Sequence, residues 1–207
     1  AVDAFREQIR GLIAGGIDVV WIETMSAPEE MQTASEAAIA ENMPFVFTAS
    51  FDTAGKTMMG MHPRDIHKVA EPLPVKPFAV GANCGVGASD ILASLLDMTD
   101  SDPAANVIVK GNCGIPEFRG AEIFYSGTPE LMSEYARLAI DGGARIIGGC
   151  CGTSYNHLAA MRHAIDGHTK RTRPTVAEVV EKIGPMRNTV AAVQGSEVRR
   201  ERKGRRG

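Results

Sequence analysis

The sequence has few aromatic residues and no long apolar run. Aromatic residues make up 5% of its 207 residues, with a single tryptophan, and no stretch of about 18 or more apolar residues occurs. Basic and acidic residues nearly balance, 22 against 25, which leaves a formal net charge of -3. This balance gives no reason to expect nucleic acid as a partner, and the missing apolar run predicts that no segment spans a membrane.

Cysteine is scarce as well, since the chain has four, of which Cys150 and Cys151 are adjacent. Adjacent cysteines do not readily form a disulfide with each other, because the small ring would strain the peptide. The first residues of the chain lack the charged-then-apolar layout of a signal peptide. Free cysteines fit a reducing compartment, and we therefore expect a cytoplasmic protein.

All four cysteines lie in glycine-rich turns that directly follow apolar, β-branched runs. The turns read Gly-Ala-Asn-Cys84-Gly, Gly-Asn-Cys113-Gly and Gly-Gly-Cys150-Cys151-Gly. Turns that follow parallel strands gather at one edge of a sheet, so these thiols could share one metal ion. Thiolates favour zinc, and three of them leave a fourth position open, as in catalytic rather than structural zinc sites.

The chain alternates between helical and strand-like patterns. The strand-like runs are mostly apolar on both faces, as in buried parallel strands, and each is followed by a helix or a connection that contains one. This order predicts a parallel α/β sheet with right-handed crossovers. The expected strands are 17–23, 45–50, 78–82, 106–110 and 144–148, and the main expected helices are 5–13, 26–41, 89–98, 129–140 and 154–165.

Two architectures are compatible with this pattern, a (β/α)8 TIM barrel and an open doubly wound sheet. A barrel places its functional residues at the carboxyl ends of the strands, where Glu23 and all four cysteines fall. The Gly-Val-Gly-Ala-Ser turn at 85–89 lacks the third glycine of a dinucleotide-binding turn. We therefore favour the (β/α)8 barrel.

The expected barrel is incomplete, because five strands cannot close a barrel that typically needs about 250 residues. The chain also begins inside a predicted helix, with no strand before it. We expect residues 1–167 to form the C-terminal part of a barrel, about its last five βα units. Residues 168–190 are expected to be a polar linker with a short helix, and 191–207 a basic, disordered tail.

Zinc bound by three thiolates is electron-rich, which makes it a poor generator of hydroxide. An incoming thiol that binds zinc at the open position would lose its proton and remain nucleophilic. Such a centre suits alkyl transfer to sulfur better than it suits hydrolysis. The cysteine pattern therefore indicates transferase chemistry.

The cysteine turns resemble the zinc-binding motifs of the homocysteine S-methyltransferase family. The resemblance is carried by the turns at 81–84 and 148–153, supported by Ile22-Glu23-Thr24 and by the proline turn at 111–116. It runs from about residue 3 to residue 190. Within the family, the segments at 51–55 and 184–188 are most similar to bacterial betaine–homocysteine methyltransferases.

The resemblance implies a barrel in which Cys84, Cys150 and Cys151 hold zinc. Homocysteine would occupy the fourth position as its thiolate, and Glu23 would help to hold its amino group. The sulfur would then take a methyl group from a small donor, with betaine preferred, to give methionine. Cys113 is not a ligand in this mapping, and Asn83 either binds substrate or fixes its own turn.

Other interpretations stay open at this point. Within the class, the donor could be methylfolate acting through cobalamin, or S-methylmethionine. Outside it, the thiols could form a non-catalytic zinc site or a redox-sensing pair. The N-terminal strands of the family, which carry an Asp-Gly-rich turn and much of the donor site, have no counterpart here. The identity of the donor is therefore inferred from whole-sequence resemblance alone, and the chain by itself could be inactive. Whether the chain forms a homo-oligomer is also open.

Overall fold

A computed structural model of the chain describes residues 1–114, 116–120 and 122–188, and its centre is a parallel sheet of five strands. The strand order is β1-β2-β3-β4-β7, and each neighbouring pair is parallel. The predicted α/β fold is thereby confirmed, whereas the expected basic tail lies outside the described residues. The strands are β1 (Val20–Met25), β2 (Phe45–Ala49), β3 (Ala79–Cys84), β4 (Val107–Gly111) and β7 (Ala144–Gly149).

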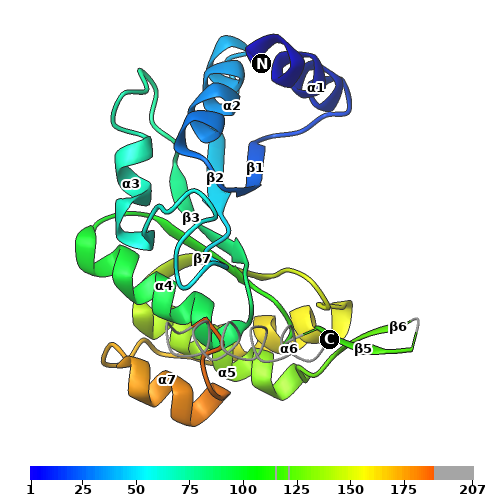
Figure 1. Ribbon diagram of the computed structural model, residues 1–207, viewed down its shortest axis with the longest axis vertical. Coiled ribbons are helices and arrows are strands. Elements are labelled where there is room, and N and C mark those ends of the chain that lie inside the picture. The colour runs from blue at the N-terminus through cyan, green and yellow to red at the C-terminus, as the bar shows by residue number, and fades with distance from the viewer. Residues whose placement is uncertain (115, 121, 189–207) are drawn as a thin grey trace, which may run out of the picture.

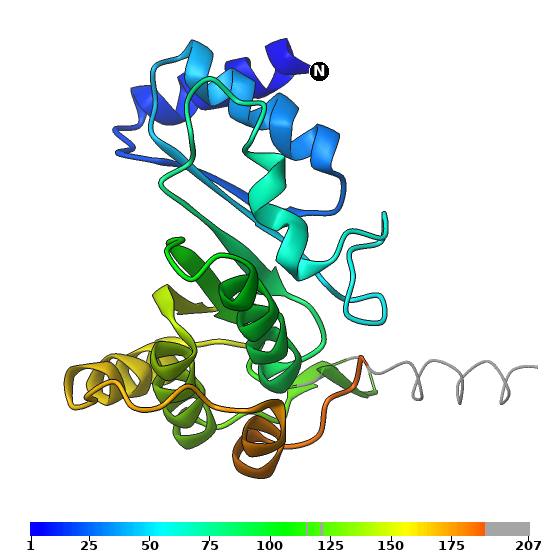
Figure 2. The same ribbon diagram turned by 90° about the vertical axis from the view of Figure 1, so that its left-hand side faces the viewer.

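The helices lie in an arc around the outside of the curved sheet (Figure 1, Figure 2). Within the described part of the chain, no helix is both long and apolar enough to cross a bilayer. The helices are α1 (Val2–Ala14), α2 (Pro28–Ala40), the 3-10 turn η1 (Pro63–Asp65), α3 (Ile66–Val69), α4 (Ala88–Ser101), α5 (Pro129–Gly142), α6 (Tyr155–Asp166) and α7 (Val176–Ile183).

The two faces of the sheet have separate apolar cores, because successive side chains of a strand point to opposite faces. The outer face packs against the helices and joins the large core, to which Phe47 of β2, Val109 of β4 and Tyr135 of α5 belong. The inner, concave face has its own small cluster of Val46, Ala79 and Ile108, with Ile146 against it. An apolar layer on the concave face is what the interior of a barrel requires.

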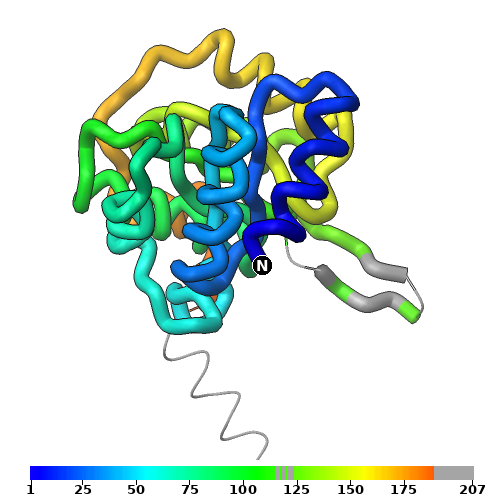
Figure 3. Tube along the Cα trace, turned by 90° about the horizontal axis from the view of Figure 1, so that it is seen from above, coloured from blue at the N-terminus to red at the C-terminus, as the bar shows by residue number. Residues whose placement is uncertain are grey.

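A β-hairpin that the sequence did not indicate lies between β4 and α5. Its strands, β5 (Pro116–Arg119) and β6 (Glu122–Tyr125), are antiparallel and meet at Gly120, whose φ of 67° suits a tight turn. The hairpin projects from the body of the molecule (Figure 3). Its last residue, Tyr125, returns to the carboxyl end of the sheet.

The segment after α6, expected as a polar linker, is anchored to the helices. His168 Nε2 lies 2.8 Å from Asp141 Oδ1, and both side chains are buried. The Arg173 guanidinium donates to the Leu96 carbonyl at 2.5 Å and to Thr99 Oγ1 at 2.6 Å. It also donates to the carbonyl of Gly142, the last residue of α5, at 3.3 Å. Carbonyls in the last turn of a helix lack partners within it, so Arg173 satisfies the end of α5 and joins it to α4.

Replacing Arg173 with alanine is expected to lower the free energy of unfolding by about 2 kcal/mol, because charge-assisted hydrogen bonds to α4 and to the end of α5 are lost. Urea denaturation would measure the change. Arg171→Ala is the matched control, since the contact of Arg171 with Asp141 is made by its backbone N–H. An equal loss in both variants would contradict the role given to the guanidinium.

Residues 184–188, here called the C-terminal strap, cross the amino end of α4. The backbone N–H groups of Arg187 and Asn188 donate to the Asp90 carboxylate, at 3.1 and 2.8 Å. The Asn188 side chain donates to the Phe51 carbonyl at 2.7 Å and accepts from the Ala54 N–H at 2.7 Å. The strap therefore joins α4 to the loop that follows β2.

Candidate metal centre

Three cysteine sulfurs converge at the carboxyl end of the sheet. Cys84 ends β3, whereas Cys150 and Cys151 follow β7, and all three Sγ atoms lie within 4.8 Å of one another. The Sγ–Sγ distance is 3.8 Å for Cys84–Cys151 and 4.0 Å for Cys150–Cys151. Sulfurs around a tetrahedral zinc with bonds of about 2.3 Å lie roughly 3.8 Å apart, so the group fits three corners of such a site.

Cys113 stands outside this group although its turn has the same composition. Its side chain is fully buried, and its Sγ donates to the Gly127 carbonyl at 3.2 Å. A Cβ on Gly127 would lie 2.7 Å from that sulfur, so Gly127 leaves space for it. The structure thus separates Cys113 from the three sulfurs that meet.

Cys84 has an unusual backbone conformation at the point where its sulfur meets those of Cys150 and Cys151. Its φ is 63°, in the left-handed region that non-glycine residues rarely adopt, and Gly85 follows with a φ of 73°. Such a conformation costs about 1–2 kcal/mol, so the surrounding contacts must hold it in place. It ends the extended strand at Cys84 and turns the chain toward α4.

Asn112 holds the two cysteine turns together and was not predicted from the sequence. Its side chain is buried, accepts from the Cys151 N–H at 3.0 Å and donates to the Gly85 carbonyl at 2.7 Å. It thus links the turn after β3 to the turn after β7. The repeated Asn-Cys-Gly at 83–85 and 112–114 is the sequence signal that could have revealed it.

Replacing Asn112 with alanine is expected to weaken metal binding by about 10- to 100-fold, because residues that orient ligands contribute that much to affinity. Competition with a chromophoric chelator would measure the change. Asn106→Ala is the matched control, since Asn106 lies before the other end of β4, where it donates to the Phe78 carbonyl. Unchanged affinity in Asn112→Ala would contradict this role.

Asn83 is buried beneath the sulfur group and all its side-chain atoms have partners. Its Oδ1 accepts from the Thr24 N–H at 2.9 Å and from Thr48 Oγ1 at 2.7 Å, and its Nδ2 donates to Thr24 Oγ1 at 2.7 Å. Its Nδ2 also lies 3.8 Å from Cys150 Sγ. These contacts support the interpretation in which Asn83 fixes the strand ends, and they place it against one of the sulfurs.

Glu23 lies on β1 and forms an ion pair with Lys110 of β4. The pair spans the concave face over the two intervening strands, β2 and β3. The Lys110 ammonium also lies 5.1 Å from the centre of the Trp21 ring. The structure therefore places Glu23 on the concave face with a cation as its partner, a feature the sequence did not indicate.

The sulfurs influence one another electrostatically. A hydrogen bond between Cys84 and Cys150 lowers the pKa of Cys150 to about 5 and raises the pKa of Cys84. Burial opposes the change at Cys150, whereas the Asn83 side chain favours its thiolate. A proton held at Cys84 thus leaves a thiolate at Cys150, the form in which cysteine binds metals.

Tyr125 of the hairpin lies beside the turn that holds the cysteine pair. Its ring fills the space beside Gly152, where a Cβ would lie 2.3 Å from the ring. Gly152 also has a φ of 76°, so a larger residue would be strained there. Burial, and then the nearby Cys151 thiol, raise the pKa of Tyr125.

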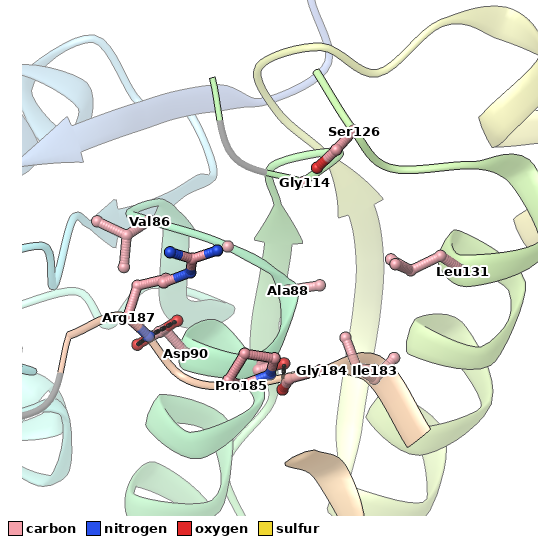
Figure 4. A pocket seen from close by; sticks show the side chains of 12 residues that line it. Val86, Ala88, Asp90, Gly114, Ser126, Leu131, Ile183, Gly184, Pro185 and Arg187 are labelled. Carbon is pink, nitrogen blue, oxygen red and sulfur yellow. Dashed lines mark hydrogen bonds between the residues drawn. The ribbon is translucent and has the colours of Figure 1, made fainter. Parts of the chain in front are cut away.

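A cavity of about 180 Å³ lies beside the turn that follows Cys84, between the amino end of α4 and the strap. Val86, Leu131 and Ile183 form its apolar wall. Asp90 and Arg187 line the polar side, and Figure 4 shows the Arg187 side chain extending toward Val86. The Asp90 carboxylate accepts from the strap backbone, so this side of the cavity is fixed in place.

The curved parallel sheet and the three thiols at its carboxyl end define an α/β protein with a cysteine cluster that could bind a metal ion. A sequence model described as homocysteine S-methyltransferase matches residues 1–165, and the chain belongs to that family. The family resemblance expected from the cysteine turns is thereby confirmed.

The fold is similar to crystal structures of the homocysteine methyltransferase MmuM from Escherichia coli. The metallated form matches with a TM-score of 0.62 and 22% identity, over 79% of this chain and 52% of that one. The apo form matches with a TM-score of 0.63 and 22% identity, over 79% of this chain and 58% of that one. The chain thus spans a little over half the length of these proteins, and its sheet is incomplete relative to their larger fold.

Proposed function

We propose that this chain carries the metal-binding part of an enzyme that transfers a methyl group to the thiol of homocysteine. The observation that supports this most directly is the convergence of Cys84, Cys150 and Cys151 in a member of the homocysteine S-methyltransferase family. Methionine would be the product. We further propose that betaine is the donor.

The donor set suits zinc, because thiolates are soft ligands and the three sulfurs have tetrahedral spacing. Cys84, Cys150 and Cys151 would hold the ion, which would supply a Lewis acid that keeps the substrate thiol in its thiolate form. Asn112 and Asn83 fix the positions of the cysteine turns. Glu23 would bind the substrate ammonium from the concave face.

In the proposed reaction, the homocysteine sulfur attacks the methyl carbon of the donor in line with the bond that breaks. A sulfur–carbon bond forms, the carbon–nitrogen bond of betaine breaks, and its electron pair stays on the leaving amine. Betaine is supported by the segments at 51–55 and 184–188, which most resemble the betaine enzymes. In the structure these two segments contact each other through Asn188.

The donor is tested with the zinc-loaded chain in a full-length form that includes the N-terminal strands of the family, because those strands carry much of the donor site. This protein is incubated with homocysteine and betaine, S-methylmethionine or methylcobalamin, and methionine is measured. We expect methionine with betaine. Methionine with one of the other donors would instead assign that donor. Reversible oxidation of Cys150 and Cys151, with neither bound zinc nor methyl transfer, would assign a redox function and overturn the proposal.

Binding of homocysteine to the zinc-loaded chain is expected to release about one proton near neutral pH, because the thiol binds as thiolate. Calorimetry in buffers of different ionisation enthalpy would measure the proton count. The metal-free chain is the control and should release no such proton. A heat of binding that is the same in every buffer would contradict the thiolate form.

A further inference from the structure

The ion pair between Glu23 and Lys110 lies where a ligand could reach it. Both residues lie on the concave face, where the side chains of Glu23 and Lys110 are 35% and 24% exposed. The pair is therefore partly desolvated yet open to a small molecule on that face. A pair in this position holds two opposite charges at a fixed separation, ready for a ligand that carries both.

The space around Lys110 is kept open by a glycine. Lys110 is paired in register with Gly148 of β7, and a Cβ on Gly148 would lie 3.1 Å from Lys110 Cγ. Gly148 precedes Cys150 by two residues, a rise of about 7 Å along a strand. Lys110 therefore lies one layer of side chains before the cysteine sulfurs along the strands. From there its ammonium can reach the amino-acid end of a thiol that is bound at the sulfurs.

The charges of the pair match those of an α-amino acid. Removing one partner of a partly buried ion pair is costly, because the other charge is left uncompensated. A zwitterion avoids this cost, since its ammonium replaces Lys110 beside Glu23 while its carboxylate provides a new partner for Lys110. A ligand with only one of the two charges would leave one side chain unpaired.

We propose that Glu23 and Lys110 together form a receptor for the amino-acid end of the thiol substrate, in which the ion pair opens and Lys110 binds the substrate carboxylate. This inference rests on the proposed function, in which the sulfur group binds the thiol. It assigns to Lys110 the selection of thiols that carry an α-amino acid over thiols that carry only an amine. Charge-assisted contacts between an ammonium and a carboxylate supply the discrimination.

The test compares Lys110→Met with the unaltered chain, both loaded with zinc, using calorimetry with two thiols. Homocysteine carries the carboxylate, whereas 3-aminopropanethiol is the same molecule without it. Lys110→Met should bind homocysteine about tenfold more weakly or worse, and should bind 3-aminopropanethiol with little change. Lys110→Arg keeps the charge and should restore most of the affinity for homocysteine.

Trp21 provides a second readout, because it is the only tryptophan of the chain and its ring lies beside the Lys110 ammonium. Binding of homocysteine should change the fluorescence of Trp21 in the unaltered chain, because Lys110 moves from Glu23 to the substrate. Zinc content and thermal unfolding, measured for each variant, separate a loss of binding from a loss of metal or fold.

Equal weakening of both thiols by Lys110→Met, or no weakening of either, would overturn the role of Lys110 while leaving the proposed function intact. Failure of the unaltered, zinc-loaded chain to bind any thiol would instead overturn the proposed function, and this inference with it. The two failures are distinguishable because only the second is visible without a variant.

Discussion

Replacing Cys150 with serine is expected to abolish metal binding at physiological zinc concentrations. Serine stays protonated at neutral pH and its oxygen is a hard ligand, so only two thiolates would remain for zinc. The loss of affinity should be about 100-fold or more. Metal analysis after dialysis, together with cobalt absorbance as a report of thiolate ligation, would measure it.

The matched control is Cys113→Ser, which changes a cysteine in a turn of the same composition. Serine at this position can still donate to the Gly127 carbonyl that the thiol contacts. Metal stoichiometry should therefore be unchanged. If Cys113→Ser lost the metal and Cys150→Ser kept it, the assignment of the three ligands would be wrong.

Replacing Gly81 with alanine is expected to cost about 3 kcal/mol of folding free energy, a large fraction of the stability of a small domain. A Cβ on Gly81 of β3 would lie 1.9 Å from the Ile108 carbonyl oxygen of β4. Backbone atoms in the centre of a sheet cannot move aside without breaking strand pairing. Thermal unfolding or the yield of soluble protein would show the effect.

Gly11→Ala is the matched control for this substitution. Gly11 lies within α1, and a Cβ there would meet no atom within 4 Å. Alanine has the higher helix propensity, so this change should stabilise the chain by about 1 kcal/mol. Destabilisation by both substitutions alike would show that the close approach of β3 and β4 is not the cause.

The parallel strands could be predicted from the sequence because burial on both faces leaves a continuous apolar run. Residues 45–49, for example, are all buried, and the expected strand at 45–50 agrees with β2 within one residue. The hairpin of β5 and β6 gave no such signal. Its strands are four residues long and mix charged with apolar residues, so no apolar run marks them.

The residues of the candidate site also fall into those that the sequence could reveal and those that only the structure reveals. Cys84, Cys150 and Cys151 could be singled out because each lies in a local glycine-rich motif that is read along the chain. The roles of Asn112, Lys110 and Tyr125 depend on which strand lies beside which and on where the end of the hairpin meets the turn after β7. That information is non-local, so residue type and spacing did not reveal it.

The contact between Asn188 and the loop after β2 joins residues that are 134 positions apart in the sequence. Because the same asparagine also donates to Asp90, the loop, the strap and the start of α4 form one cooperative unit of local unfolding. The Ala54 amide should exchange its hydrogen only when Asn188 departs. We therefore expect this loop, which lies beside the candidate metal site, to open only when the strap is released.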